Sequence, residues 1–308
     1  MSTLDSTRVE TVAMPARSSA VGRLLDYAEL TKPRIALLVL FTVAIGYYLG
    51  SDGRWQPATL LHALIGIALV AAGSSALNQF SERDTDARMH RTANRPLPSG
   101  RLQPGEVLAF GIAAGGLGCV YIAATVNLST AALAATTLLL YTVAYTPLKR
   151  ATSLCTAVGA VAGALPPVLG WSAAGGTLGE GAFVLFGILF LWQFPHFLAI
   201  AWLYQDDYAR AGLKMLPTPK PRVRVVGLMC VAYTLALLPI SLLPSQVGLA
   251  GHGYFFAATV LGAGYLLCAV RFWLCESKRT ARGLIYASLL YLPLLLLLLT
   301  WNHFQLLR

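Results

Sequence analysis

Residues 55–81 read WQPATLLHALIGIALVAAGSSALNQFS and contain no Asp, Glu, Lys or Arg. A helix needs about 20 residues to cross the hydrocarbon core of a bilayer, so this stretch predicts one membrane-spanning helix. Four more charge-free stretches predict one crossing each, at 35–51, 151–179, 181–205 and 283–307. Two others, 107–148 and 225–270, are long enough for two crossings and have turn-forming residues near the middle, at 127–130 and 244–253. The sequence therefore predicts nine transmembrane helices.

The composition excludes an ordinary water-soluble domain. Hydrophobic residues make up 56% of the 308 residues and charged residues only 12%, whereas about 25% of an average soluble domain is charged. We therefore interpret the chain as an all-α integral membrane protein. Residues 31–308 are predicted to form one nine-helix transmembrane domain, preceded by a cytoplasmic segment at 1–30.

The formal net charge of +10 is distributed as in a membrane protein, which argues against a nucleic-acid partner. If the N-terminus is cytoplasmic and nine helices alternate sides, only Arg54 and Arg308 of the 23 Lys and Arg lie outside. Cytoplasmic loops are enriched in Lys and Arg, so the asymmetry predicts a cytoplasmic N-terminus and an external C-terminus. Residues 1–30 lack the apolar run of a signal peptide, which favours a multi-pass protein of a bacterial inner membrane.

Charged residues concentrate in the predicted inner loops, of which 82–106 and 205–224 are the largest. Asn78, Glu82 and Asp86 are spaced four residues apart, so they share one face if the helix continues through them. Their oxygen atoms suit Mg²⁺, which prefers carboxylates together with phosphate and water. Arginines able to bind phosphate oxygens follow at 88, 91, 95 and 101. The pattern is typical of a diphosphate site, with Asp86 in an aqueous loop, but the spacing alone also fits an ordinary juxtamembrane loop.

The stretch from Asn78 through Glu82 and Asp86 to RTANRPLPSG at 91–100 resembles the signature of the UbiA superfamily of intramembrane prenyltransferases. The resemblance implies nine helices around a central cavity, and Mg²⁺-dependent transfer of an isoprenoid from its diphosphate to an electron-rich acceptor. Similarity to the heme branch of this superfamily extends from residue 30 to 217. It is carried by LTKPRI at 30–35, ERDTD at 82–86, YTPLKR at 145–150, GALPP at 163–167, WQFPHF at 192–197 and DYARAGLKMLP at 207–217.

The heme branch transfers a farnesyl group from farnesyl diphosphate to a vinyl group of protoheme IX (heme b), with addition of water. The resemblance implies that one or two Mg²⁺ ions are held by Asn78, Glu82 and Asp86, with support from Asp206 and Asp207. Six basic residues are expected near the diphosphate: Arg34, Arg91, Arg95, Lys149, Arg150 and Lys214. Of these, Arg91, Arg95 and Lys149 are the preferred contacts. Three aromatic rings are expected near the developing carbocation: Tyr145, Tyr204 and Tyr208. The catalytic candidates are Asn78, Glu82, Asp86, Lys149 and Tyr145.

His196 lies inside the sixth predicted helix, and an ionisable side chain within a membrane span indicates a functional site. Neutral imidazole is a ligand of heme iron, so His196 is expected to contact the heme substrate. The alternative is a hydrogen bond between helices, since Pro195 frees a backbone acceptor. His62, inside the second helix, is a weaker candidate for the same part.

Two sequence features favour different prenyl acceptors, one a heme and the other a quinone precursor. Quinone-precursor enzymes of the superfamily carry a second Asp-x-x-x-Asp motif after the sixth helix, whereas this chain has Tyr204 and Tyr208 there, as the heme branch does. Lys214, in contrast, is the type of residue that the quinone-precursor enzymes carry at this position. A polyprenyltransferase acting on an aromatic quinone precursor is therefore the alternative. A membrane transporter is less favoured, because the acids cluster at one membrane face and transporter sites lie near the midplane.

Expected partners are membrane lipid and either heme A synthase or assembly factors of heme-copper oxidases.

Overall fold

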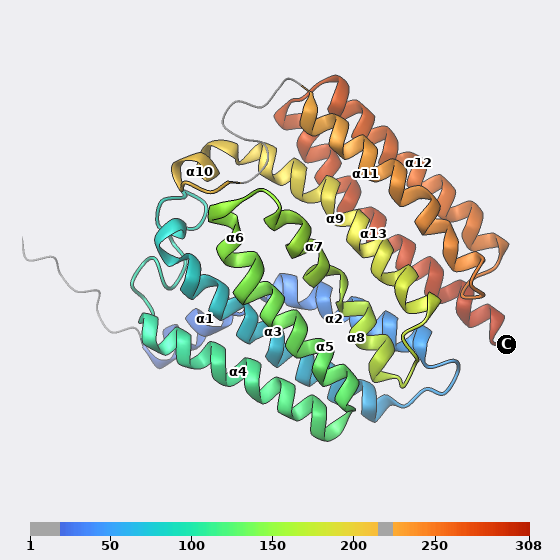
Figure 1. Ribbon diagram of the computed structural model, residues 1–308, viewed down its shortest axis with the longest axis horizontal. Helices are drawn as coiled ribbons and strands as arrows, with labels where there is room; N and C mark the ends of the chain where they lie inside the picture. Colours follow the sequence, from blue (N-terminus) through green and yellow to red (C-terminus); the bar gives the residue numbers. More distant parts are fainter. Residues whose placement is uncertain (1–18, 215–223) are drawn as a thin grey trace, which may run out of the picture.

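The computed structural model describes residues 19–214 and 224–308, and Figure 1 shows them as a bundle of long helices. Most of the predicted segment 1–30 and residues 215–223 of the predicted loop 205–224 lie outside the described residues. All regular structure in the described ranges is helical. Nine of these helical segments are long and apolar enough to cross a membrane. The prediction of an all-α, multi-pass membrane protein is confirmed.

The nine spans follow the predicted order along the chain. They are α2 (Pro33–Gly50), α3 (Pro57–Asp86), α4 (Pro104–Thr125), α5 (Leu128–Leu139) continued by η1 (Leu140–Tyr145) and α6 (Thr146–Ala151), α7 (Cys155–Ala164) with α8 (Pro166–Ala173), α9 (Glu180–Leu203), α11 (Val225–Leu242) with η2 (Leu243–Ser245), α12 (His252–Leu274) and α13 (Lys278–Leu306). Two shorter helices, α1 (Ala20–Leu30) and α10 (Gln205–Arg210), lie outside the spans.

Both double crossings are confirmed, but the first turn is shorter than predicted. The side chain of Asn127 accepts a hydrogen bond from the backbone N–H of Thr130 at 2.7 Å. Asn at this position satisfies a free N–H at the start of a helix. Residues 128–130 therefore form the first turn of α5 and are not part of the connection.

The fourth span contains a π-helical turn, η1, just before Pro147. Proline has no N–H to bond the carbonyl four residues earlier. At the end of the π turn, both the backbone N–H and the hydroxyl of Thr146 donate to the Tyr141 carbonyl, the hydroxyl at 2.8 Å. Single π turns inside α-helices are frequent at functional sites. This one ends at Tyr145 and therefore sets the direction of that ring relative to the rest of the span.

α2 and α8 pack with their backbones in contact. A Cβ added to Gly46 would lie 1.9 Å from the Pro167 carbonyl oxygen, and one added to Gly170 would lie 1.9 Å from the Val43 carbonyl oxygen. Small residues allow such close approach of helices within a membrane. The contact fixes α2, and with it the residues at its N-terminal end, against the fifth span.

The polar segments gather at one end of the bundle. In Figure 1, α6, α10 and the connection between α3 and α4 lie together at that end, whereas the C-terminus lies at the opposite end. α1 is tied to the same connection by Arg101, which pairs with Asp26 and Glu29. The side chain of Gln79 also donates to the Leu30 carbonyl at 2.8 Å. The end of α1 is therefore held directly beside α3.

Candidate active site

α3 continues without a break to Asp86, which meets the condition for a shared face, and it carries Asn78, Glu82 and Asp86 on that face. These residues are buried, with exposed fractions of 1%, 7% and 1%. The prediction that the loop begins at residue 82, with Asp86 in water, is therefore wrong. Residues 82–86 are helical, and the chain that follows covers Asp86, because Thr92 donates to the Asp86 carbonyl at 2.9 Å.

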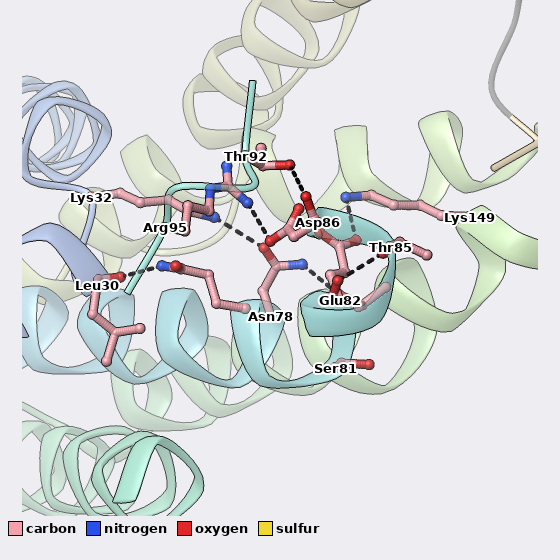
Figure 2. Close-up of polar contacts among 12 residues, drawn as sticks. Leu30, Lys32, Asn78, Ser81, Glu82, Thr85, Asp86, Thr92, Arg95 and Lys149 are labelled. Carbon is pink, nitrogen blue, oxygen red and sulfur yellow. Dashed lines mark hydrogen bonds and ion pairs between the residues drawn. The ribbon is translucent and has the colours of Figure 1, made fainter. Parts of the chain in front are cut away.

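Each of these three side chains contacts one cation from a different part of the sequence, as Figure 2 shows. The pairs are Lys32–Asn78, Lys149–Glu82 and Arg95–Asp86, with N–O distances of 3.0, 2.7 and 2.6 Å. The cations come from the turn before α2, from α6 and from the connection after α3. The fold therefore brings three oxygen-bearing side chains and three cations together at one end of the bundle.

Lys32 is the member of this group that the sequence pattern did not indicate. It lies in the turn between α1 and α2 with a left-handed backbone, φ 51, a conformation uncommon for residues other than glycine. Burial and the charges of Arg95 and Lys149 lower the pKa of Lys32 to about 7. The lowered pKa reflects first the burial of the ammonium group and then the neighbouring positive charges. Arg34, the predicted contact from this segment, is exposed on the first turn of α2.

One oxygen atom of this group, on Asp86, is available to a further cation. Asp86 Oδ1 is buried and makes no hydrogen bond to any described residue, and Glu82 Oε1 meets Lys149 as an ion pair without hydrogen-bond geometry. A buried acceptor without a hydrogen bond costs about 1–3 kcal/mol. Oxygen ligands of this kind are those that Mg²⁺ prefers. The side chains present therefore fit a divalent cation.

The second predicted acid pair lies on α10. Asp206 is exposed, and Asp207 pairs with Arg210 within the same short helix. Within residues 19–214 and 224–308, no three Asp, Glu, His or Cys side chains come together in a group that could hold a metal. The structure therefore does not bring these two acids together with the carboxylates of α3, and their support of a metal stays a prediction.

Aromatic rings lie beside the cations. Lys149 Nζ is 4.4 Å from the centroid of the Tyr145 ring. The guanidinium of Arg91 lies over Tyr204 at 5.2 Å, which connects the segment after α3 with the end of α9. Tyr208 is partly buried on α10, a helix at the same end of the bundle in Figure 1. The three predicted tyrosines therefore all lie at the cationic end of the bundle.

Two further predicted cations take part in backbone contacts around this end. Arg150 Nη2 donates to the Ser81 carbonyl of α3 at 3.1 Å. The backbone N–H of Lys214 donates to the Lys149 carbonyl at 2.8 Å, while the Lys214 side chain is exposed. Both residues adjoin the site, and neither contacts the oxygen ligands of α3 in a hydrogen bond or ion pair among the described residues.

His196 makes the hydrogen bond between helices that was its alternative interpretation. Its Nδ1 lies 2.7 Å from Ser288 Oγ of α13, and its ring stacks on Trp192. The bond uses one ring nitrogen, so a substrate contact through the other nitrogen stays a prediction. His62 Nδ1 lies 2.7 Å from the Tyr121 hydroxyl and connects α3 with α4.

Comparison with known proteins gives a family match over most of the chain. Residues 39–292 match the model of the UbiA prenyltransferase family. The chain is 48% identical to a protoheme IX farnesyltransferase of Solibacter usitatus (strain Ellin6076), over 88% of this chain and 96% of the relative. It is 45% identical to a protein of the same name from Koribacter versatilis (strain Ellin345), over 94% of this chain and 96% of the relative.

Solved structures share the fold at low sequence identity. One, from work on digeranylgeranylglyceryl phosphate synthase in membranes, has a TM-score of 0.77 at 16% identity and covers 92% of this chain and 99% of that chain. A UbiA homologue from Archaeoglobus fulgidus, bound to DMAPP and Mg²⁺, has a TM-score of 0.57 at 18% identity, with the same coverage of both chains. Because the family match and the two similar relatives extend over most of its length, the chain belongs to the UbiA prenyltransferase family.

Proposed function

We propose that the protein transfers the farnesyl group of farnesyl diphosphate to a vinyl group of protoheme IX, with addition of water, giving heme O and diphosphate. Relatives 45% and 48% identical over nearly their whole length are named for this reaction. The structural observation that carries the proposal is the group of three cations on three buried oxygen ligands at one end of the bundle. This arrangement suits a metal-bound diphosphate.

The metal-binding part of the proposal assigns Asn78, Glu82 and Asp86 to Mg²⁺, as one or two ions, with support from Asp206 and Asp207. When bound, Mg²⁺ stabilises the negative charge that develops on a departing diphosphate. The unpaired Asp86 Oδ1 supports this assignment, because it is a buried acceptor without a hydrogen bond among the described residues. The Archaeoglobus fulgidus homologue was solved with Mg²⁺ and a prenyl diphosphate.

The cations of the site would bind the diphosphate itself. Three cations carry N–H donors that can bond a phosphate oxygen in place of their present protein partner: Lys32, Arg95 and Lys149. A hydrogen bond to a charged group contributes about 1.5–3 kcal/mol, and donors already in position also stabilise the leaving group as the C–O bond breaks. Four further residues would surround the diphosphate at longer range: Arg34, Arg91, Arg150 and Lys214.

The bond changes follow from these groups. The diphosphate leaves with the electron pair of its C–O bond, and the farnesyl carbon forms a new C–C bond with the terminal vinyl carbon. Water adds to the resulting cation and releases a proton. Electron-rich ring faces stabilise cations, and Tyr145 is placed for this by its contact with Lys149, with Tyr204 and Tyr208 nearby.

The heme would extend from this end into the bundle. His196 lies eight residues before Tyr204, or about 12 Å along the helix axis at 1.5 Å per residue. We propose that His196 contacts the heme at this depth.

We also place the protein in a bacterial inner membrane with the site on the cytoplasmic side, because the predicted inner loops carry most of the Lys and Arg. Heme A synthase or an oxidase assembly factor would then receive the product.

The experiment is a reaction of the purified protein in lipid bilayers with farnesyl diphosphate, heme b and Mg²⁺, analysed by mass spectrometry. The expected product is heavier than heme b by one farnesyl and one hydroxyl group, and chelation of Mg²⁺ should abolish it. No modified heme in a preparation whose folding is verified would contradict the proposal.

A further inference from the structure

Ser288 of α13 is completely buried and lies between His196 of α9 and the backbone of its own helix. Its hydroxyl donates to the Ile285 carbonyl at 2.6 Å, and a carbonyl can only accept. The same Oγ lies 2.7 Å from His196 Nδ1. A hydroxyl has a single proton. If that proton is directed to Ile285, Ser288 Oγ accepts from the imidazole, and the hydrogen of His196 is then on Nδ1.

This assignment leaves the other ring nitrogen of His196 with a lone pair. A neutral imidazole carries one N–H, so protonation at Nδ1 makes Nε2 the acceptor. In metal-binding histidines, the hydrogen bond at one nitrogen determines which nitrogen binds the metal and how the ring is oriented. The Ser288 contact therefore prepares Nε2 as an electron-pair donor.

The plane of the imidazole is fixed by the same serine through a second contact. The Trp192 indole Nε1 donates to the Ser288 carbonyl at 2.8 Å. The Trp192 ring stacks on His196, with centroids 5.4 Å apart and planes inclined by 16°. Both the hydrogen bond at Nδ1 and the stacking surface thus depend on one residue of α13.

The neighbours of His196 place it toward the interior of the bundle. Trp192, one turn earlier, contacts α13, while Gln193 donates to the Ala160 carbonyl of α7 at 3.1 Å. Residues four apart share a helix face, so His196 lies on the side of α9 between its contacts with α13 and α7. Its side chain is only partly buried, so part of the ring stays accessible beside these contacts.

We infer that Ser288 is a positioning residue, which holds His196 in the Nδ1–H tautomer and directs the Nε2 lone pair to the iron of a porphyrin substrate. This inference rests on the proposed function for the identity of the ligand. The tautomer itself is independent of it, because it follows from the hydrogen bonds alone. The two parts are therefore tested separately.

The tautomer is tested by ¹⁵N NMR of protein labelled at histidine and reconstituted without heme, with His196→Ala to assign the resonance. We expect a protonated Nδ1 and an unprotonated Nε2 in the wild type, and a loss of this preference in Ser288→Ala. Ser288→Thr keeps the hydroxyl and should restore it. Ser241→Ala is the matched control, since Ser241 is equally buried and bonds Leu237 and Tyr291 instead. A protonated Nε2 in the wild type would overturn the inference.

The iron contact is tested by titrating heme b into the same variants and recording the absorption and resonance Raman spectra. His196→Ala should remove the histidine ligand. Loss of a residue that orients a ligand costs on the order of tenfold in metal affinity, so Ser288→Ala should weaken heme binding by about that factor. Ser288→Thr and Ser241→Ala should resemble the wild type.

The possible failures are distinguishable. Wild-type spectra and affinity in both His196→Ala and Ser288→Ala would overturn the iron contact, while farnesyl transfer, measured by product mass, would stand. If the wild type neither binds nor farnesylates heme, the proposed function and the iron contact both fail. The NMR experiment still decides the tautomer in that case.

Discussion

Arg95 Nη1 lies 2.6 Å from Asp86 Oδ2, and this ion pair joins the segment after α3 to the last turn of that helix. The Asp86 side chain is 1% exposed and that of Arg95 is 24% exposed. Removing one partner of a buried ion pair leaves the other charge uncompensated and destabilises the fold. Any neutral substitution of Asp86 leaves Arg95 uncompensated, so a test of Asp86 as a metal ligand should at least keep its shape and an acceptor oxygen for Arg95.

Asp86→Asn meets this requirement. We expect the variant to remain folded and to lose farnesyl transfer by on the order of 100-fold, because an amide provides less charge for Mg²⁺ at a site of electrostatic catalysis. Initial rates across a Mg²⁺ series, together with the thermal unfolding midpoint, measure both effects. Asp84→Asn is the control, since Asp84 is exposed on the same helix. A wild-type rate in Asp86→Asn at ordinary Mg²⁺ would remove Asp86 from the metal site.

Lys32→Ala should raise the KM for farnesyl diphosphate about tenfold or more. One hydrogen bond to a charged group contributes about 1.5–3 kcal/mol, and 1.4 kcal/mol corresponds to about a factor of ten. Lys278→Ala removes an exposed lysine at the start of α13 and should leave this KM unchanged. If the two variants behave alike, Lys32 does not bind the diphosphate.

Gly159→Ala should disturb Tyr145 without unfolding the protein. The added Cβ would lie 2.7 Å from the Tyr145 ring, which must shift. If that ring stabilises the carbocation, kcat should fall several-fold, in line with a cation–π contribution of about 0.5–2 kcal/mol, while the KM for the diphosphate changes little. Gly264→Ala is the comparison, because its Cβ meets nothing within 4 Å. Equal kcat values in the two variants would argue against a role for the ring.

Gly46→Ala should destabilise the fold. Its Cβ would lie 1.9 Å from a backbone carbonyl of α8, which cannot move aside as a side chain can. Overpacking typically costs about 1–3 kcal/mol, and a backbone contact this close belongs at or above the upper end. Thermal unfolding in lipid nanodiscs should therefore give a clearly lower midpoint than for Gly264→Ala. Equal midpoints would show that α2 and α8 can separate without cost.

The features that the sequence could predict depend on local patterns. The spans follow from charge-free length, and the alignment of Asn78 with Asp86 follows from helical spacing. The contacts of Lys32 and Ser288 could not be predicted in this way, because their partners are 46 and 92 residues distant in sequence. The burial of Asp86 has a different cause. Thr92 and Arg95, which cover it, are only 6 and 9 residues away, but no periodic pattern predicts that this segment folds back onto the helix end.

The identity of the acceptor is the central claim, and a competition assay tests it most directly. Purified protein in lipid bilayers receives farnesyl diphosphate, Mg²⁺ and equal concentrations of heme b and 4-hydroxybenzoate, and the products are separated by mass. We predict farnesylated, hydroxylated heme as the product, with the benzoate unchanged. Farnesylated 4-hydroxybenzoate with unmodified heme would contradict the account and assign the chain to the quinone-precursor branch.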